Sequence, residues 1–161
     1  MSPQFKFETV LRIVRGLSWV YDKYGVMHRD IKPSNILFDS RGLSYITDWG
    51  LARPISNAFS FMESNLRVSD ITRESRTQIG SFVGTLTYAS PEQIVGAEDL
   101  DHRSDIYSLG CVMYELEKGN PPFFHEDPLK LVQQHLYESH QKLGGIFSRT
   151  VVSHIKLTEI F

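Results

Sequence analysis

The sequence predicts an α+β fold that is mainly helical and carries one short β-hairpin. Apolar residues recur every three or four positions over Phe7–Tyr24 and again over Asp101–Lys118, which is the spacing of two buried helical faces. Between these helices, the runs Ile36–Phe38 and Leu43–Thr47 are rich in strand-forming residues, and the turn Asp39–Gly42 separates them. A chain of 161 residues has the length of about one domain.

The composition indicates a globular protein and argues against several function classes. Hydrophobic residues make up 41% of the chain and aromatic residues 12%, which is enough for a real core. The formal net charge of −2 provides no basic field for nucleic acid and no polybasic membrane signal. The only cysteine, Cys111, excludes a disulfide framework and suits a reducing compartment. No membrane span or signal peptide is recognisable, so we expect a cytoplasmic chain without a nucleic-acid partner or a membrane segment.

Each of the two long helices has a recognisable end or environment. Gly25 follows the first helix and can adopt the left-handed conformation that stops a helix at no steric cost. The second helix is apolar on two sides, which predicts a position in the middle of the domain with Cys111 in the core rather than as a reactive thiol. Asp105 lies near its start, where a carboxylate suits the positive end of the helix dipole.

The loop between the first helix and the hairpin carries the pattern H-R-D-x-K-x-x-N, formed by His28, Arg29, Asp30, Lys32 and Asn35. Asp48–Gly50 follows the second predicted strand and reads D-W-G. A single aspartate or lysine in a turn is more often a solvated surface charge, but the joint spacing favours a catalytic role. Together these residues resemble the catalytic loop and the metal-binding D-F-G motif of eukaryotic-type protein kinases.

The resemblance assigns a role to each residue of the motifs and implies ATP and Mg²⁺ as cofactors. Asp30 would accept the proton of the attacking hydroxyl, and Lys32 would stabilise charge on the transferred phosphate, as in serine/threonine kinases. Asn35 and Asp48 would bind magnesium. Leu37 would pack under the adenine ring, although an ordinary core leucine fits the same position. Tryptophan in place of the usual phenylalanine at the second position of D-F-G is a departure from the family.

The stretch Gly84–Gln93 resembles the G-T-x-x-Y-x-[AS]-P-E sequence that closes the activation segment of serine/threonine kinases, in the S-P-E-Q form common among bacterial members. In that family, the residues matching Gly84 and Thr85 shape the peptide-binding site, and the threonine also bonds to the catalytic aspartate and lysine. Glu92 would pair with a late arginine, but no partner arginine is recognisable. Ser90-Pro91 is also a good helix start, and both interpretations can hold together. His28 and Asp105 are assigned to structural support of the catalytic loop.

The segment Leu51–Phe82 has no sustained periodicity and is predicted to be the loop that matches the activation segment. A phosphate on one of its hydroxyls would bring negative charge near Arg29. Thr77 is our first choice for this modification and Ser81 the second. The alternative for each is a solvated loop hydroxyl.

The resemblance covers about Phe7–Ser139, and we divide the chain into a kinase C-lobe at residues 1–139 and a divergent tail at 140–161. No glycine-rich loop or V-A-I-K-type lysine precedes the first helix, so we expect the N-lobe to be absent from this sequence. The leading hypothesis is a serine/threonine protein kinase that transfers the γ-phosphate of ATP to a protein substrate. The alternative is a weak or inactive kinase fragment that acts as a binding or regulatory module. A small-molecule phosphotransferase is less favoured, because Gly84–Gln93 matches a peptide-binding feature.

Overall fold

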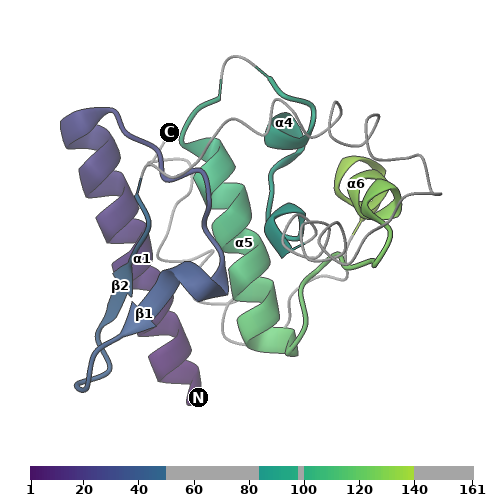
Figure 1. Ribbon diagram of the computed structural model, residues 1–161. Coiled ribbons are helices and arrows are strands. Elements are labelled where there is room, and N and C mark those ends of the chain that lie inside the picture. The colour runs from purple at the N-terminus through teal and green to yellow at the C-terminus, as the bar shows by residue number, and fades with distance from the viewer. Residues whose placement is uncertain (50–83, 98–99, 140–161) are drawn as a thin grey trace, which may run out of the picture.

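The computed structural model describes residues 1–49, 84–97 and 100–139. Within them the elements follow in the order α1 (Pro3–Tyr24), the 3-10 turn η1 (Pro33–Asn35), β1 (Ile36–Phe38), β2 (Ser44–Ile46), α4 (Pro91–Ile94), α5 (Arg103–Lys118) and α6 (Pro128–Tyr137). The predicted fold class is confirmed in its general form, helices with one antiparallel strand pair (Figure 1). Thr77, Ser81 and the tail at 140–161 lie outside the described residues.

Helix α1 begins four residues earlier than the apolar periodicity predicts, because its start is set by capping. The Ser2 hydroxyl accepts a hydrogen bond from the Phe5 amide at 3.2 Å, and proline occupies the first turn. The helix ends as predicted: Gly25 adopts φ 63° and its N–H donates to the Tyr21 carbonyl at 2.7 Å. The buried stripe that faces the core includes Val10.

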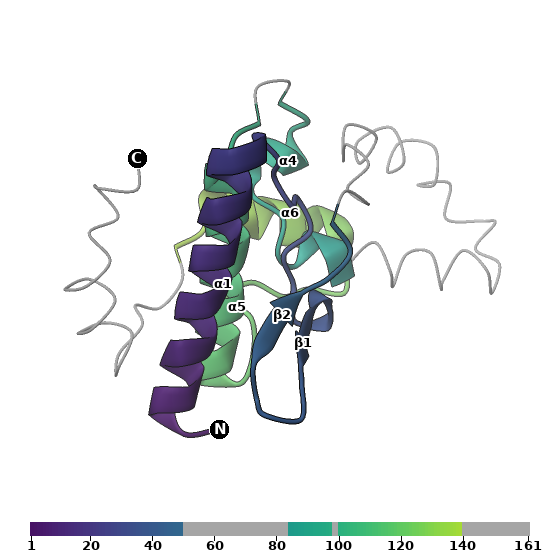
Figure 2. The ribbon, with the colours of Figure 1, turned by 90° about the vertical axis from the view of Figure 1, so that its left-hand side faces the viewer.

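Helix α5 lies in the centre of the described structure, between α1 on one side and α4 with α6 on the other (Figures 1 and 2). One apolar cluster joins α1, the catalytic loop, β1 and α5, and consists of Val10, Ile13, Leu17, Ile31, Ile36, Leu109 and Val112. A second joins the α4 region to α6 and consists of Leu86, Ala89, Ile94, Phe123, Leu131 and Val132. Each such side chain contributes about 1.5–3 kcal/mol through burial. The sequence therefore correctly predicted a central helix, and Cys111, at 4% exposure, belongs to its buried surface.

The hairpin packs beside the N-terminal half of α1 (Figure 2). Leu37 is paired with Tyr45 in an antiparallel register, and the Phe38 ring lies 5.6 Å from the Phe5 ring of α1. The Asp39 carboxylate accepts hydrogen bonds from turn amides, including that of Leu43 at 2.9 Å, which fixes the turn. This pairing places the residue before β1 and the residues after β2 side by side, which is the arrangement that the site requires.

The two shorter helices each begin at a side-chain cap, and the start at Ser90 was predicted from the sequence. Asp127 accepts a hydrogen bond from the Leu129 amide at 3.0 Å at the start of α6. Ser90 caps α4, with proline at the next position. Across the described parts of the chain, no helix combines the length and apolar character needed to cross a membrane.

Candidate active site

The Asp30 carboxylate is the centre of a small polar cluster on the loop between α1 and β1. Its Oδ2 lies 2.8 Å from the Lys32 ammonium and 3.0 Å from the Asn35 Nδ2, which also donates to the Asp30 carbonyl at 2.8 Å. The Lys32 and Asp30 side chains are 23% and 22% exposed, so the pair is partly open to solvent. The structure therefore brings together three of the predicted site residues at the surface of the loop.

Asp105 on α5 fixes the backbone of this loop. Its two carboxylate oxygens accept hydrogen bonds from the backbone amides of His28 and Arg29, each at 2.7 Å. Burial raises the pKa of the Asp105 carboxyl, and the two amide donors act in the opposite direction. Arg29 adopts φ 65°, an uncommon conformation for a residue with a side chain, and the bond to Asp105 helps to hold it there.

The His28 ring connects the loop to the end of the hairpin. Its Nε2 lies 2.7 Å from the Thr47 carbonyl, which can only accept, so the hydrogen is on Nε2. The Nδ1 can then accept from the Asp30 amide at 3.3 Å. Thr47 also donates its own amide to the Asn35 carbonyl at 3.0 Å. These bonds fix the position of the chain immediately before Asp48.

Asp48 follows β2 and has φ 63°, which places it in the left-handed region. The neighbouring Trp49 ring meets the His28 ring edge-on at 4.9 Å, and its Nε1 donates to the Ile46 carbonyl at 3.2 Å. The larger aromatic ring therefore finds a specific place against the catalytic loop. A residue other than glycine in this region of φ carries backbone strain of order 1–3 kcal/mol, and residues strained in this way cluster at functional sites.

The donor set at this end of the hairpin suits a hard cation such as magnesium. Both side-chain hydrogen bonds of Asn35 use its amide nitrogen, so the amide oxygen is the atom suited to a metal ion. Asp48 supplies a carboxylate. In the residues described, no group of three or more His, Cys, Asp or Glu side chains forms a complete metal cage. Magnesium is usually held by one or two protein oxygens together with substrate phosphates, so this donor set fits it.

In the described part of the chain, the predicted adenine- and peptide-binding residues make no hydrogen bond to Asp30. Leu37 is 53% exposed on the open face of the hairpin, beside Tyr45. Gly84 is exposed, and Thr85 is half-buried with its carbonyl accepting from the Tyr88 amide at 3.3 Å. Where the chain is described, Thr85 makes no hydrogen bond to Asp30 or Lys32.

Three long-range contacts of this region were not predicted from the sequence. Glu92, for which no partner arginine is recognisable, accepts from the Ser104 hydroxyl at 2.7 Å. Gln93 donates from Nε2 to the Arg29 carbonyl at 2.8 Å. The Tyr88 hydroxyl donates to Glu115 at 2.6 Å. The only available signal was the S-x-x-Q spacing from Ser90 to Gln93, which is that of a capping box.

The chain matches a known protein family over most of its length. The family described as the protein kinase domain matches residues 3–157 of the chain. The chain belongs to this protein kinase family. The predicted resemblance is thereby confirmed.

The kinase chain is also similar to curated bacterial serine/threonine kinases. It is 36% identical to the serine/threonine-protein kinase PknB of Mycobacterium leprae over 138 residues, which cover 86% of this chain and 20% of that protein. It is 41% identical to the probable serine/threonine-protein kinase PknB of Corynebacterium glutamicum over 114 residues, 71% of this chain and 15% of that protein. The chain thus spans about a fifth of the length of the curated relatives that it matches.

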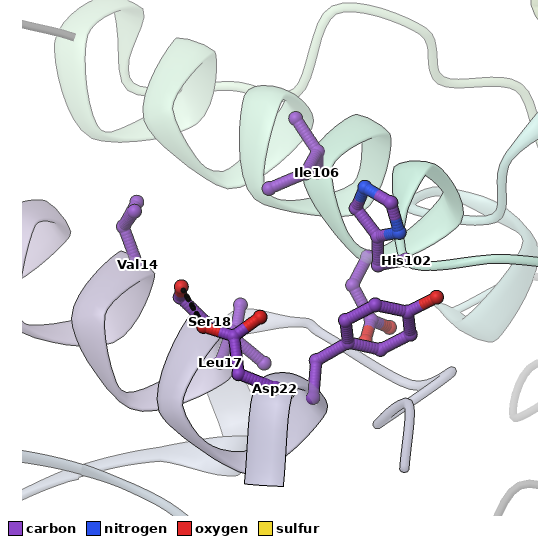
Figure 3. Close-up of a pocket in the computed structure, with 8 residues that line it drawn as sticks. Val14, Leu17, Ser18, Asp22, His102 and Ile106 are labelled. Atoms are coloured by element: carbon purple, nitrogen blue, oxygen red, sulfur yellow. Dashed lines mark hydrogen bonds between the residues drawn. The ribbon is translucent and has the colours of Figure 1, made fainter. Parts of the chain in front are cut away.

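The chain also has a small cavity of about 70 Å³ between α1 and α5 (Figure 3). Leu17 and Tyr21 line it from α1, and Ile106 lines it from α5. Its volume is that of a few water molecules. This cavity is too small for a nucleotide, and Asp105 also lines it.

Proposed function

We propose that residues 1–139 form the C-lobe of a serine/threonine protein kinase that transfers the γ-phosphate of ATP to a serine or threonine of a protein substrate, and that 140–161 form a divergent tail. The observation that carries this proposal is the cluster of Asp30, Lys32 and Asn35 beside Asp48. Phosphoryl transfer depends on positioning and charge stabilisation more than on covalent catalysis by the protein. This cluster offers both.

The proposed mechanism assigns one task to each side chain. The Asp30 carboxylate would accept the proton of the attacking hydroxyl as its oxygen bonds to the γ-phosphorus, while the bond from that phosphorus to the bridging oxygen breaks and ADP leaves. The Lys32 ammonium, 2.8 Å from Asp30, would stabilise charge on the transferred phosphoryl group. Asn35 and Asp48 would hold magnesium through an amide oxygen and a carboxylate. The chemistry supplied from outside the chain would be the phosphoryl group of ATP and the positive charge of magnesium, which offsets part of the negative charge of the phosphates.

The remaining predicted residues complete the proposal. Leu37 would contact the adenine ring, because it is an exposed apolar side chain on the hairpin. Gly84 and Thr85 would shape the segment that receives the substrate peptide. A phosphate on Thr77 or Ser81 would pair with Arg29 and regulate the site. His28, Glu92 and Asp105 would act as structural support through the contacts described above.

The decisive experiment measures transfer of labelled phosphate from ATP to a generic basic protein in the presence of magnesium. Asp30→Asn should lower the rate by about 10²–10⁴-fold, because the proton acceptor is lost while the shape remains. Asp22→Asn makes the same chemical change on the exposed face of α1 and serves as the control. Equal transfer by the wild type and Asp30→Asn would overturn the role of Asp30. Absence of transfer by the wild type, with magnesium-dependent ATP binding retained, would favour the binding-module alternative.

A further inference from the structure

The Gln93 side chain is buried between α4 and the catalytic loop, at 4% exposure. Its Nε2 donates to the Arg29 carbonyl at 2.8 Å, across 64 positions in the sequence. Its Oε1 accepts a hydrogen bond from the Ser90 backbone amide at 3.0 Å. The backbone amide of Gln93 donates to the Ser90 hydroxyl at 3.3 Å. One side chain therefore completes the cap of α4 and reaches the loop that carries Asp30.

The contacts of Oε1 with Ser90 and of Nε2 with Arg29 determine the orientation of the Gln93 side-chain amide. Rotating the amide by half a turn would place its NH₂ group against the Ser90 N–H and its oxygen against the Arg29 carbonyl. Both contacts would then join like with like in a buried place, where an unpaired polar group costs about 1–3 kcal/mol. The helix cap thus aims the Nε2 donor at the loop.

The carbonyl that receives this bond belongs to the peptide between Arg29 and Asp30. The amide of Arg29 is held by Asp105, and the amide of Asp30 points to the His28 Nδ1 at 3.3 Å. Gln93 supplies the contact for the carbonyl between them. Arg29 has φ 65°, so this peptide needs such contacts on both sides to keep its orientation.

We infer that Gln93 is a positioning residue for Asp30: by holding the Arg29 carbonyl, it sets the direction of the peptide from which the Asp30 carboxylate projects. The link makes the orientation of the catalytic loop depend on α4, which is itself joined to α5 through Glu92 and Ser104. The consequence for phosphotransfer rests on the proposed function. The consequence for the loop backbone does not.

The test compares Gln93→Glu and Gln93→Met with Gln133→Glu, which makes the same change at an exposed position of α6. Glutamate retains an oxygen for the Ser90 amide but places a second oxygen against the Arg29 carbonyl. Methionine fills a similar volume and donates no hydrogen bond. Amide hydrogen exchange of residues 28–30, corrected for intrinsic rates and compared with wild type at each pH, reports on the loop without requiring activity.

At pH 8 both Gln93 variants should exchange residues 28–30 about three- to tenfold faster than wild type, as expected for the loss of one hydrogen bond. At pH 5 the buried carboxyl of Gln93→Glu can be protonated and can donate to the Arg29 carbonyl, so protection should return towards wild type. Gln93→Met should not recover. The wild-type ratio at the two pH values accounts for effects of pH that do not depend on residue 93.

Where the wild type transfers phosphate, kcat of both Gln93 variants should fall more than KM changes, and Gln93→Glu should regain part of its kcat at the lower pH. Unchanged exchange at 28–30 in both variants would overturn the inference. An equal increase across 109–118 of α5 would also overturn it, because that pattern indicates general loss of stability. A wild type without phosphotransfer contradicts the proposed function alone, since the exchange result stands by itself.

Discussion

Removing the Asp105 carboxylate should destabilise the protein strongly, because one buried and one partly buried backbone donor depend on it. In Asp105→Ala the amides of His28 and Arg29 lose their acceptor together. His28 is fully buried, so water does not readily replace the lost oxygen at its amide. Arg29 loses the contact that holds its φ at 65°.

The magnitude follows from the two unsatisfied donors. Each buried group left without a partner costs about 1–3 kcal/mol, so Asp105→Ala should lower the free energy of unfolding by about 2–6 kcal/mol. Burial raises the pKa of Asp105, which means that its ionised form carries a desolvation cost in the folded protein. The alanine variant no longer has this cost, so its loss of stability should lie towards the lower end of that range. Asp105→Asn keeps one accepting oxygen and places an NH₂ group against the other donor. Its loss should therefore be smaller, about 1–3 kcal/mol.

Urea denaturation followed by circular dichroism and tryptophan fluorescence measures these differences. Trp49 contacts His28, so its emission also reports on the catalytic loop. The control is Asp101→Asn, where the partly exposed carboxylate pairs with Arg103 and one accepting oxygen remains, and the expected loss is below about 1 kcal/mol. An Asp105→Ala variant within about 0.5 kcal/mol of wild type would refute this account of how the loop is held.

Two further predictions concern buried titratable groups. Burial lowers the pKa of His135 to about 4, so the unfolded chain takes up a proton that the folded chain does not. Stability should then fall by at most about 3 kcal/mol as the pH drops from 6.5 to 4, and His135→Gln should flatten this dependence in urea titrations; an unchanged slope in the variant would exclude His135 as its source. Burial also raises the pKa of Cys111 to about 12, so a thiol reagent should react slowly with the native protein and rapidly in urea. Equal rates in the two conditions would contradict its place in the core.

The local elements could be predicted because their signals are local. The apolar spacing of α1 and α5 indicates which face each helix buries, and Gly25 stops α1 where a left-handed residue is needed. The β1 strand was predicted with its observed bounds, Ile36–Phe38. The start of α1 was wrong by four residues, because the Ser2 cap lies outside the apolar pattern on which the prediction relied.

The grouping of Asp30, Lys32 and Asn35 could be predicted only because these residues are close in sequence and share a recognisable spacing. The contacts that orient it join residues far apart, such as Asp105 with His28 across 77 positions and Gln93 with Arg29 across 64. No periodicity links such positions, since their meeting depends on how α4 and α5 pack beside the loop. The partner of Glu92 was missed for the same reason: a serine hydroxyl provides the hydrogen bond, whereas the search was for an arginine.

The backbone conformation of the site is the part that local rules predict least. Arg29 and Asp48 both have positive φ, although arginine and aspartate occur there far less readily than glycine. Each lies next to a carboxylate or carries one. The surrounding contacts account for the conformation: Asp105 and Gln93 hold the two sides of Arg29, while His28 and Asn35 fix the residue before Asp48. The residue types at the site therefore indicate phosphoryl transfer as its proposed chemistry. The packing of α4, α5 and the hairpin determines the direction in which the Asp30 and Asp48 carboxylates point.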